Sequence, residues 1–210
     1  MAEELVFYTN PMSRGRIVRW MLEEVGQPYR SQVLDYADGM KSPAYLAINP
    51  MGKVPALTHG TTVITEGAAI CAYLADAFPQ AGLAPPPADS ERGPYYRWLF
   101  FAAGPLEAAV TNRSLGIEVK PEQQRMVGYG AYVHVMDALE QALDGREYLA
   151  GGRFSAADLY LGSHLDWGMN FGTVEKRPVF EAYVARLRGR PAHVRASEID
   201  NGLAAQSPPA

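Results

Sequence analysis

The 210-residue sequence contains a single cysteine, Cys71, and no apolar run long enough to span a membrane. One cysteine can form neither an intrachain disulfide nor a cysteine-based zinc site. The four histidines lack the spacing of metal ligands, so we expect no metal. Basic residues do not predominate either, since 19 Lys and Arg against 23 Asp and Glu leave a formal net charge of −4. We therefore expect no nucleic-acid partner and no membrane partner.

The first residues do not look like an export signal. They read MAEELVF, which is acidic and lacks a basic segment followed by an apolar one. We therefore expect a cytoplasmic protein. An apolar share of 48% and a charged share of 20% are typical of a globular chain, and the length allows one or two domains.

The first eighty residues alternate between two patterns. Short runs of β-branched and aromatic residues predict strands at residues 5–8, 29–34, 54–58 and 61–64. Apolar residues three or four positions apart predict helices at residues 13–25 and 66–78, with a loop or short helix at residues 41–48. The order β-α-β-α-β-β-α predicts an α/β domain over residues 1–83.

The composition then changes at a proline-rich stretch. Residues 84–93 contain the sequence APPPAD, which predicts a semi-rigid linker. Beyond it, apolar spacing predicts only helices, at residues 94–110, 122–143, 156–168 and 179–187. The tail from Asn201 shows no periodicity, and we expect it to fray. The sequence thus predicts an all-helical second domain over residues 94–210.

Three local patterns occur in this layout. They are YTNPMSRGRIVRWMLEE at residues 8–24, NPMGKVPAL at residues 49–57 followed by TEGAAI at residues 65–70, and FSAADL at residues 154–159. Together with the proline-rich joint, they resemble the cytosolic glutathione transferases over nearly the whole chain. The resemblance implies a thioredoxin-like domain followed by a helical domain, a homodimer, a role in detoxification, and glutathione as co-substrate with no metal.

The chemistry of such an enzyme requires the thiol of glutathione to ionise. A hydroxyl donor at the start of a helix can stabilise the thiolate. Ser13, between the first strand and the first helix, is our first candidate. Asn10, Tyr8 and Thr9 in the same loop remain alternatives, and a plain helix cap remains the structural alternative for Ser13.

The resemblance also implies a glutathione-binding site. In the family, the peptide before the equivalent of Pro55 is cis, and the main chain of the preceding residue, here Val54, pairs with the cysteinyl part of glutathione. An ordinary trans turn is the alternative. Lys41 and Lys53 are candidates for the glycyl carboxylate, although isolated lysines are more often solvated surface residues.

At the start of the third helix, the family usually has an acidic residue followed by serine. Glu66 fits the first position, where the acid pairs with the γ-glutamyl amine. Gly67 departs from the second position: it keeps the main-chain N–H but lacks the hydroxyl that binds the γ-glutamyl carboxylate. This departure predicts weaker binding of glutathione.

Two other features favour structural roles. Ser155 and Asp158 have the spacing of a capping box at a helix start, and Cys71 lies in an apolar helix as an inert thiol. The leading functional hypothesis is a glutathione transferase acting on hydrophobic electrophiles. A glutathione-dependent hydroperoxide or disulfide reductase, and a non-catalytic binding module on the same scaffold, are the alternatives.

Overall fold

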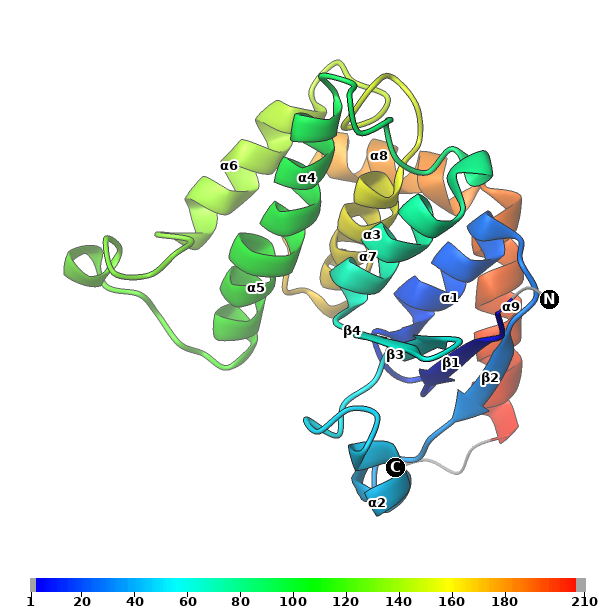
Figure 1. The fold of residues 1–210 in the computed structure, drawn as a ribbon. Helices are drawn as coiled ribbons and strands as arrows, with labels where there is room; N and C mark the ends of the chain where they lie inside the picture. The colour runs from blue at the N-terminus through cyan, green and yellow to red at the C-terminus, as the bar shows by residue number, and fades with distance from the viewer. Residues whose placement is uncertain (1–2, 207–210) are drawn as a thin grey trace. The chain divides into compact units, whose positions relative to one another are not determined.

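A computed structural model describes residues 3–206, whose contacts form two compact units (Figure 1). The described part of the first unit comprises residues 3–81 and 190–206, and the second unit comprises residues 82–189. A four-stranded sheet with helices and a separate helical unit confirm the predicted fold class. Within residues 3–206, no helix is long and apolar enough to cross a bilayer. The domain bounds 1–83, 84–93 and 94–210 stay a prediction, and residues 1–2 and 207–210 lie outside the described chain.

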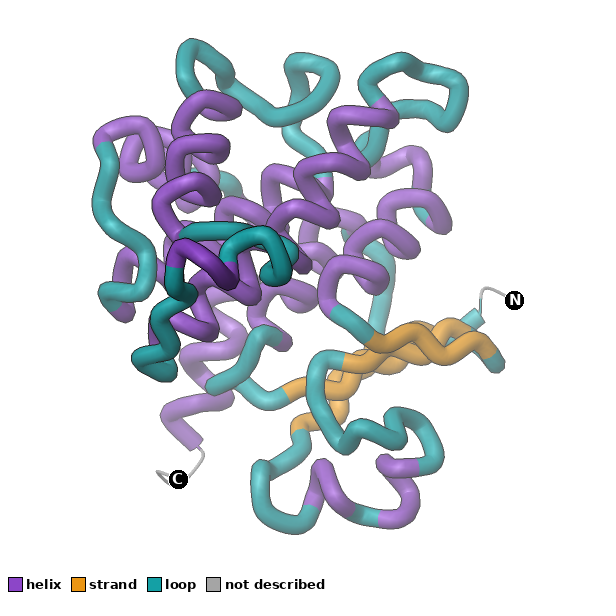
Figure 2. Tube along the Cα trace, turned by 90° about the vertical axis from the view of Figure 1, so that its left-hand side faces the viewer, coloured by secondary structure: helices purple, strands orange, loops and turns teal. Residues whose placement is uncertain are grey.

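The sheet of the first unit is mixed. Its strands are β1 (Leu5–Thr9), β2 (Arg30–Val33), β3 (Ala56–His59) and β4 (Thr62–Thr65), in the order β2-β1-β3-β4. Strand β1 runs parallel to β2 and antiparallel to β3, which forms a hairpin with β4. Figure 2 shows the strands of the sheet gathered together in orange. The element order agrees with the predicted β-α-β-α-β-β-α pattern.

Helices cover both faces of this sheet. α1 (Gly15–Val25) and α3 (Gly67–Ala77) lie on one face, and the short α2 (Pro43–Leu46) lies on the other (Figure 1). Strand β1 is buried on both sides because successive side chains point to opposite faces. Phe7 contacts Arg19 of α1, whereas Tyr8 packs with Tyr45 of α2. Single turns of 3-10 helix occupy Gly39–Lys41 and Pro79–Ala81.

The last helix of the chain, α9 (Pro191–Gln206), packs on α1 and belongs to the first unit. The expectation of a frayed tail from Asn201 was therefore wrong for residues 201–206, and residues 207–210 lie outside the described chain. Apolar periodicity missed this helix because polar pairs contribute to its docking. One of them joins Arg19 to Asp200 at 2.8 Å, with both side chains 1% exposed.

The second unit is built around α7 (Ala156–Phe171), most of which is buried. It contacts α4 (Arg92–Phe101) and α8 (Pro178–Arg188), while α5 (Glu107–Ser114) and α6 (Tyr132–Leu143) complete the unit. Gly162 lets α7 and α8 approach closely, since a Cβ at this position would lie 2.2 Å from Leu187 Cδ1. The separation of sheet and helices into two units follows the change in composition near residue 84.

Two predicted helices differ from those observed. The helix expected at residues 122–143 begins only at Tyr132, after a 3-10 turn at Pro121–Gln123 and a left-handed Gly130 with φ of 68°. The helix expected at residues 94–110 is interrupted by a π-helical turn, Ala102–Leu106, which contains Pro105. Proline has no N–H to donate inside a helix, so the regular pattern changes there.

The start of α7 is fixed by the predicted capping box. The Asp158 carboxylate accepts from the Ser155 N–H at 2.9 Å and from the Ser155 hydroxyl at 2.7 Å. It also accepts from the Leu149 N–H and the Tyr183 hydroxyl, each at 2.8 Å. Burial raises the pKa of Asp158, although these four donors act in the opposite direction. The role of this motif is structural.

Candidate functional site

Strand register brings the predicted site segments to one edge of the sheet. Tyr8 pairs with Ala56, and Ala56 pairs with Thr65. Continued by two residues, the first register reaches Asn10 and Val54, and the second reaches Val54 and Gly67. The same edge therefore holds the start of α1, the start of α3 and the segment leading into β3 (Figure 1). Helix N-termini present free N–H groups and favour anions.

Ser13 lies in the loop between β1 and α1 and is 8% exposed. Its Oγ donates to the Asn10 carbonyl at 2.7 Å and accepts from the Gly15 N–H at 2.9 Å. The hydroxyl thus binds the first N–H of α1, although the N-cap residue of the helix is Arg14 and not Ser13, as the structural alternative had it. Its single proton points to a neutral carbonyl, and to serve a thiolate it would have to rotate.

The other loop candidates differ in how their polar groups are used. Asn10 is 9% exposed, its Nδ2 donates to the Leu34 carbonyl at 2.7 Å, and its Oδ1 accepts from the Met12 N–H at 2.9 Å. Its amide is therefore committed to loop structure. Tyr8 packs against Tyr45 with ring centroids 5.6 Å apart, and its hydroxyl has no hydrogen bond within residues 3–206. The Thr9 hydroxyl is buried, also without a partner in the described chain.

In the segment before β3, the main-chain groups of Val54 have no hydrogen-bond partner among residues 3–206. The Val54–Pro55 peptide is cis, as the resemblance implied. Across the described ranges, neither the N–H nor the carbonyl of Val54 forms a hydrogen bond. Val54 itself is half-buried against the cluster on the α2 side of the sheet. A peptide ligand could pair with these two groups as an added strand does.

The two lysine candidates lie in different settings. Lys41 Nζ donates to the carbonyls of Met51 and Gly52 at 3.2 and 3.0 Å, so it holds the loop that precedes Val54. The Lys53 side chain is exposed and has no hydrogen bond within residues 3–206. Of the two ammonium groups, only that of Lys53 is uncommitted in the described chain.

Glu66 and Gly67 form the start of α3. Glu66 has a φ of 66°, and among residues 3–206 it is the only non-glycine residue with positive φ. This conformation costs about 1–3 kcal/mol and is typical of functional sites. The Glu66 side chain is exposed, and Gly67 supplies the first N–H of the helix. The pair thus offers a carboxylate and a helix N-terminus at one point.

Comparisons with known proteins place this site in a family. Residues 12–77 match the glutathione S-transferase N-terminal domain, and residues 105–191 match the glutathione S-transferase C-terminal domain. Glutathione S-transferase GST-4.5 of Xanthomonas campestris pv. campestris is 32% identical over 165 residues, 74% of this chain and 76% of that protein. The chain belongs to the glutathione S-transferase family.

Other members agree with this assignment. Glutathione S-transferase GstA of Escherichia coli O157:H7 is 30% identical, over 77% of this chain and 78% of that protein. Among solved structures, a sphingomonad glutathione S-transferase complexed with glutathione has a TM-score of 0.76 and 29% identity. The match covers 93% of this chain and 98% of that one. The enzyme from Xylella fastidiosa has a TM-score of 0.78 at 25% identity, covering 94% and 99%.

This glutathione S-transferase also holds its site with residues that the sequence patterns did not identify. The buried Asn49 donates from Nδ2 to the Lys53 carbonyl at 2.8 Å, and the Tyr45 hydroxyl donates to the same oxygen. Burial raises the pKa of Tyr45 to about 12, so the hydroxyl stays a donor. Both bonds fix the residue before Val54. Asn49 and Lys53 lie only four positions apart, but the acceptor is a main-chain carbonyl, which no residue type in the sequence indicates.

Cys71 takes no part in the site. It is completely buried within α3, and burial raises the pKa of its thiol far above the ordinary value. A neutral buried thiol is a poor nucleophile. The structure therefore agrees with the expectation of an inert cysteine.

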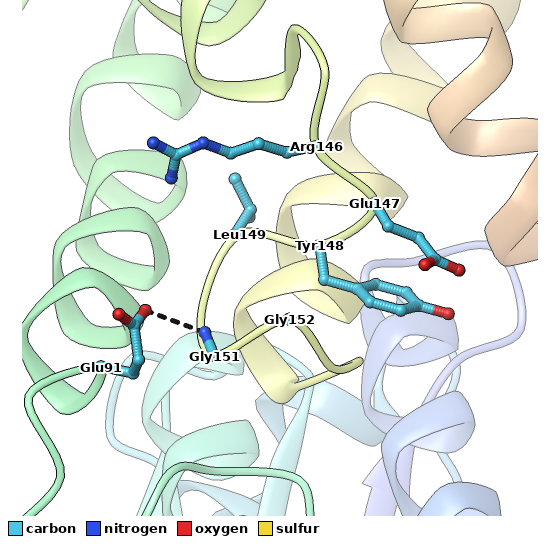
Figure 3. A pocket seen from close by; sticks show the side chains of 7 residues that line it. All are labelled: Glu91, Arg146, Glu147, Tyr148, Leu149, Gly151 and Gly152. Carbon is cyan, nitrogen blue, oxygen red and sulfur yellow. Dashed lines mark hydrogen bonds between the residues drawn. The ribbon is translucent and has the colours of Figure 1, made fainter.

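The helical unit of this glutathione S-transferase has a separate hollow (Figure 3). It has a volume of about 520 Å³ and is lined by Glu91, Arg146, Glu147, Tyr148, Leu149, Gly151 and Gly152. The Gly151 N–H donates to Glu91 at 2.8 Å on one side of it. None of the predicted site residues lies here, so this hollow is not the predicted glutathione site.

Proposed function

We propose that this chain is a glutathione transferase whose thiolate is stabilised by Ser13 at the start of α1. The convergence of the β1–α1 loop, the free main-chain groups of Val54 and the start of α3 on one sheet edge carries this proposal. Family membership also supports glutathione as the ligand, since a similar sphingomonad enzyme is complexed with glutathione.

Hydrogen-bond energies favour a change of partner by the Ser13 hydroxyl, from the Asn10 carbonyl to the thiolate. Lowering a thiol pKa of about 8.5 by two units takes about 2.7 kcal/mol. The bond from Ser13 to the Asn10 carbonyl is a neutral one, worth about 0.5–1.5 kcal/mol, whereas a bond to an anion is worth about 1.5–3 kcal/mol. Rotation toward sulfur therefore gains about 1 kcal/mol, and the helix end adds about 0.3–2 kcal/mol. The two contributions together can account for a shift of one to two units.

The remaining groups suit the other parts of the tripeptide. The N–H and carbonyl of Val54 would pair with the cysteinyl backbone, as an added strand. The Glu66 carboxylate would bind the γ-glutamyl amine, and the Gly67 N–H would bind the γ-glutamyl carboxylate. Lys53, whose ammonium is uncommitted in the described chain, suits the glycyl carboxylate better than Lys41, which holds the carbonyls of Met51 and Gly52.

The chemical step is a nucleophilic substitution or addition. The thiol loses its proton to water, and the Ser13 O–H donates to the resulting thiolate. The sulfur then forms a bond to an electrophilic carbon, and a leaving group such as halide departs with its electron pair. We propose hydrophobic electrophiles as the acceptors. The buried Cys71 supports this over thiol-disulfide exchange, because the protein brings no second thiol to the site.

We also propose a homodimer in the cytoplasm, acting in detoxification. Exposed apolar side chains in each unit support an interface between copies: Met51 is 68% exposed in the first unit, and Phe100 is 64% exposed in the second. The family resemblance supports both the cellular location and the role in detoxification. Sedimentation equilibrium tests the dimer, and a monomer at micromolar concentration would contradict it.

The proposed function is tested by calorimetry with glutathione and by product analysis with an aryl halide. The proposal predicts binding at millimolar glutathione or below and formation of the aryl conjugate. Oxidised glutathione as the main product with an organic hydroperoxide, without any conjugate, would instead identify a reductase. Absence of heat and of a thermal shift at millimolar glutathione would identify a non-catalytic module.

A further inference from the structure

The last helix of the chain reaches the β1–α1 loop. Within the first unit, α9 runs antiparallel along α1, and polar pairs join the two helices near both ends. Far from the loop, Arg190, the residue before α9, makes two hydrogen bonds to the Glu24 carboxylate, at 2.6 and 2.8 Å. Close to the loop, Arg16 Nη1 donates to Asn201 Oδ1 at 2.8 Å.

Arg16 binds the loop as well as α9. Its Nε donates to the main-chain carbonyl of Pro11, two residues before Ser13. A guanidinium is planar, and its N–H groups point in fixed directions. Two bonds from one guanidinium therefore fix the Pro11 carbonyl relative to Asn201. Through the Arg16 guanidinium, the Asn201 side chain of α9 therefore orients the Pro11 carbonyl of the loop.

The direction of loop carbonyls matters for an anionic sulfur. The Met12 carbonyl accepts from the Tyr36 hydroxyl at 3.0 Å, and the Asn10 carbonyl accepts from Ser13 at 2.7 Å. When the Ser13 hydroxyl turns toward sulfur, the Asn10 carbonyl keeps only its bond from the Ser13 N–H at 3.1 Å, and the bonds to the Met12 and Pro11 carbonyls remain. A loop carbonyl free to turn toward the thiolate would raise the thiol pKa, because its oxygen carries partial negative charge.

We propose that Asn201 and Arg16 are positioning residues through which α9 holds the β1–α1 loop for thiol activation. Neither residue touches the reacting sulfur in this scheme, since both act through the Pro11 carbonyl. The inference rests on the proposed function, because it concerns the same loop. It gives the final helix of the chain a part in a site that begins at residue 10.

The test measures the pKa of the bound glutathione thiol, from the ultraviolet absorbance of the thiolate, together with kcat and KM. In Asn201→Leu, which removes the acceptor at similar size, we expect this pKa to rise by about 0.5–1 unit. At neutral pH, kcat should fall about 2–5-fold while KM for glutathione stays within about twofold. Asn201→Asp keeps an acceptor for Arg16 and should restore the wild-type pKa.

Arg190→Met is the matched control, because it loosens the same helix pair at the end remote from the loop. We expect it to lower thermal stability and to leave the thiol pKa unchanged. An equal rise of the thiol pKa in Arg190→Met and in Asn201→Leu would overturn the proposal, because it would show that only the general docking of α9 on α1 matters. If Asn201→Leu does not fold, Arg16→Met gives the same readout, and an unchanged pKa there overturns the proposal. A wild-type thiol with an ordinary pKa would overturn the proposed function itself, before any variant is compared.

Discussion

Among the serines that precede helices in this chain, Ser155 and Ser13 have hydroxyls that are bound differently. Ser155, before α7, is 1% exposed and donates to the Asp158 carboxylate at 2.7 Å. Ser13, before α1, is 8% exposed and donates to the neutral Asn10 carbonyl at 2.7 Å. A hydrogen bond to a charged group is about twice as strong as a neutral one. The hydroxyl of Ser155 is therefore locked, whereas that of Ser13 can change to a stronger partner.

The role of a serine before a helix therefore depends on the group to which its hydroxyl donates. Buried polar groups that bind a charged partner inside the protein, such as Ser155 with Asp158, should control stability. Groups at the open sheet edge, such as Ser13 and Gly67, should control catalysis and glutathione binding. Variants at the two kinds of position should therefore affect different measurements.

The largest effect is expected from Asp158→Ala. The substitution removes the acceptor of two N–H and two hydroxyl donors, from Leu149, Ser155 and Tyr183. We expect the free energy of unfolding to fall by about 3–4 kcal/mol, because these donors are left unpaired in the core. Denaturant unfolding of the purified variant measures the loss.

Asp166→Ala is the control for that loss, in the same helix. Asp166 pairs with Arg188, whose side chain is 50% exposed, and accepts from the exposed Asn170 amide at 2.9 Å, so solvent screens its interactions. We expect a change of about 0–1 kcal/mol. Equal losses of stability in the two variants would show that burial does not distinguish the two carboxylates, and would contradict the comparison.

Sequence patterns predicted most of the first unit because its signals are local. The alternation of strand and helix and the start of α3 are each defined within a few residues, whereas the cis Val54–Pro55 peptide was expected from the family resemblance. The capping box of α7 was also read correctly, since serine and its carboxylate lie three residues apart. These features depend on short-range chemistry, which a single sequence displays.

Nonlocal polar contacts account for what the patterns missed. Helix α9 presents a weak apolar stripe, and ion pairs with residues more than 160 positions away help to dock it on α1. The partner of the Ser13 proton, the Asn10 carbonyl, is a main-chain group that no residue type announces. The sequence therefore placed Ser13 at the site without showing that its hydroxyl is already engaged.

The second prediction uses the buried thiol to sharpen the contrast between stability and catalysis. Burial raises the pKa of Cys71 in the folded state, so above the unfolded thiol pKa of about 8.5 only the unfolded chain ionises. The folded state then binds more protons, and stability falls as pH rises. We expect Cys71 to contribute a loss of up to about 1.4 kcal/mol per pH unit above about pH 9.

Cys71→Ala isolates that contribution from those of other groups. Its unfolding free energy should decline less steeply between about pH 8 and about pH 10 than that of the wild type. Unfolding curves for both proteins at the two pH values provide the comparison. Identical slopes would mean that Cys71 ionises equally in both states, contrary to its complete burial.

The smallest effect is expected from Gly67→Ser at the open edge. The substitution supplies the hydroxyl that the family usually has at the start of α3. One added hydrogen bond of about 1 kcal/mol should lower KM for glutathione about 3–10-fold. Gly67→Ala changes the backbone entropy without adding the hydroxyl, so it separates the two causes. The same KM in both variants would assign the effect to the backbone.

The most direct test of the account is the pKa of the thiol of bound glutathione in wild type, Ser13→Ala and Ser155→Ala. The account predicts a value below the ordinary 8.5 in the wild type, a rise of about one unit in Ser13→Ala, and no change in Ser155→Ala. Ser155→Ala should instead lose about 1–2 kcal/mol of stability. A thiol pKa that is the same in Ser13→Ala and in the wild type would contradict the claim that this hydroxyl stabilises the thiolate.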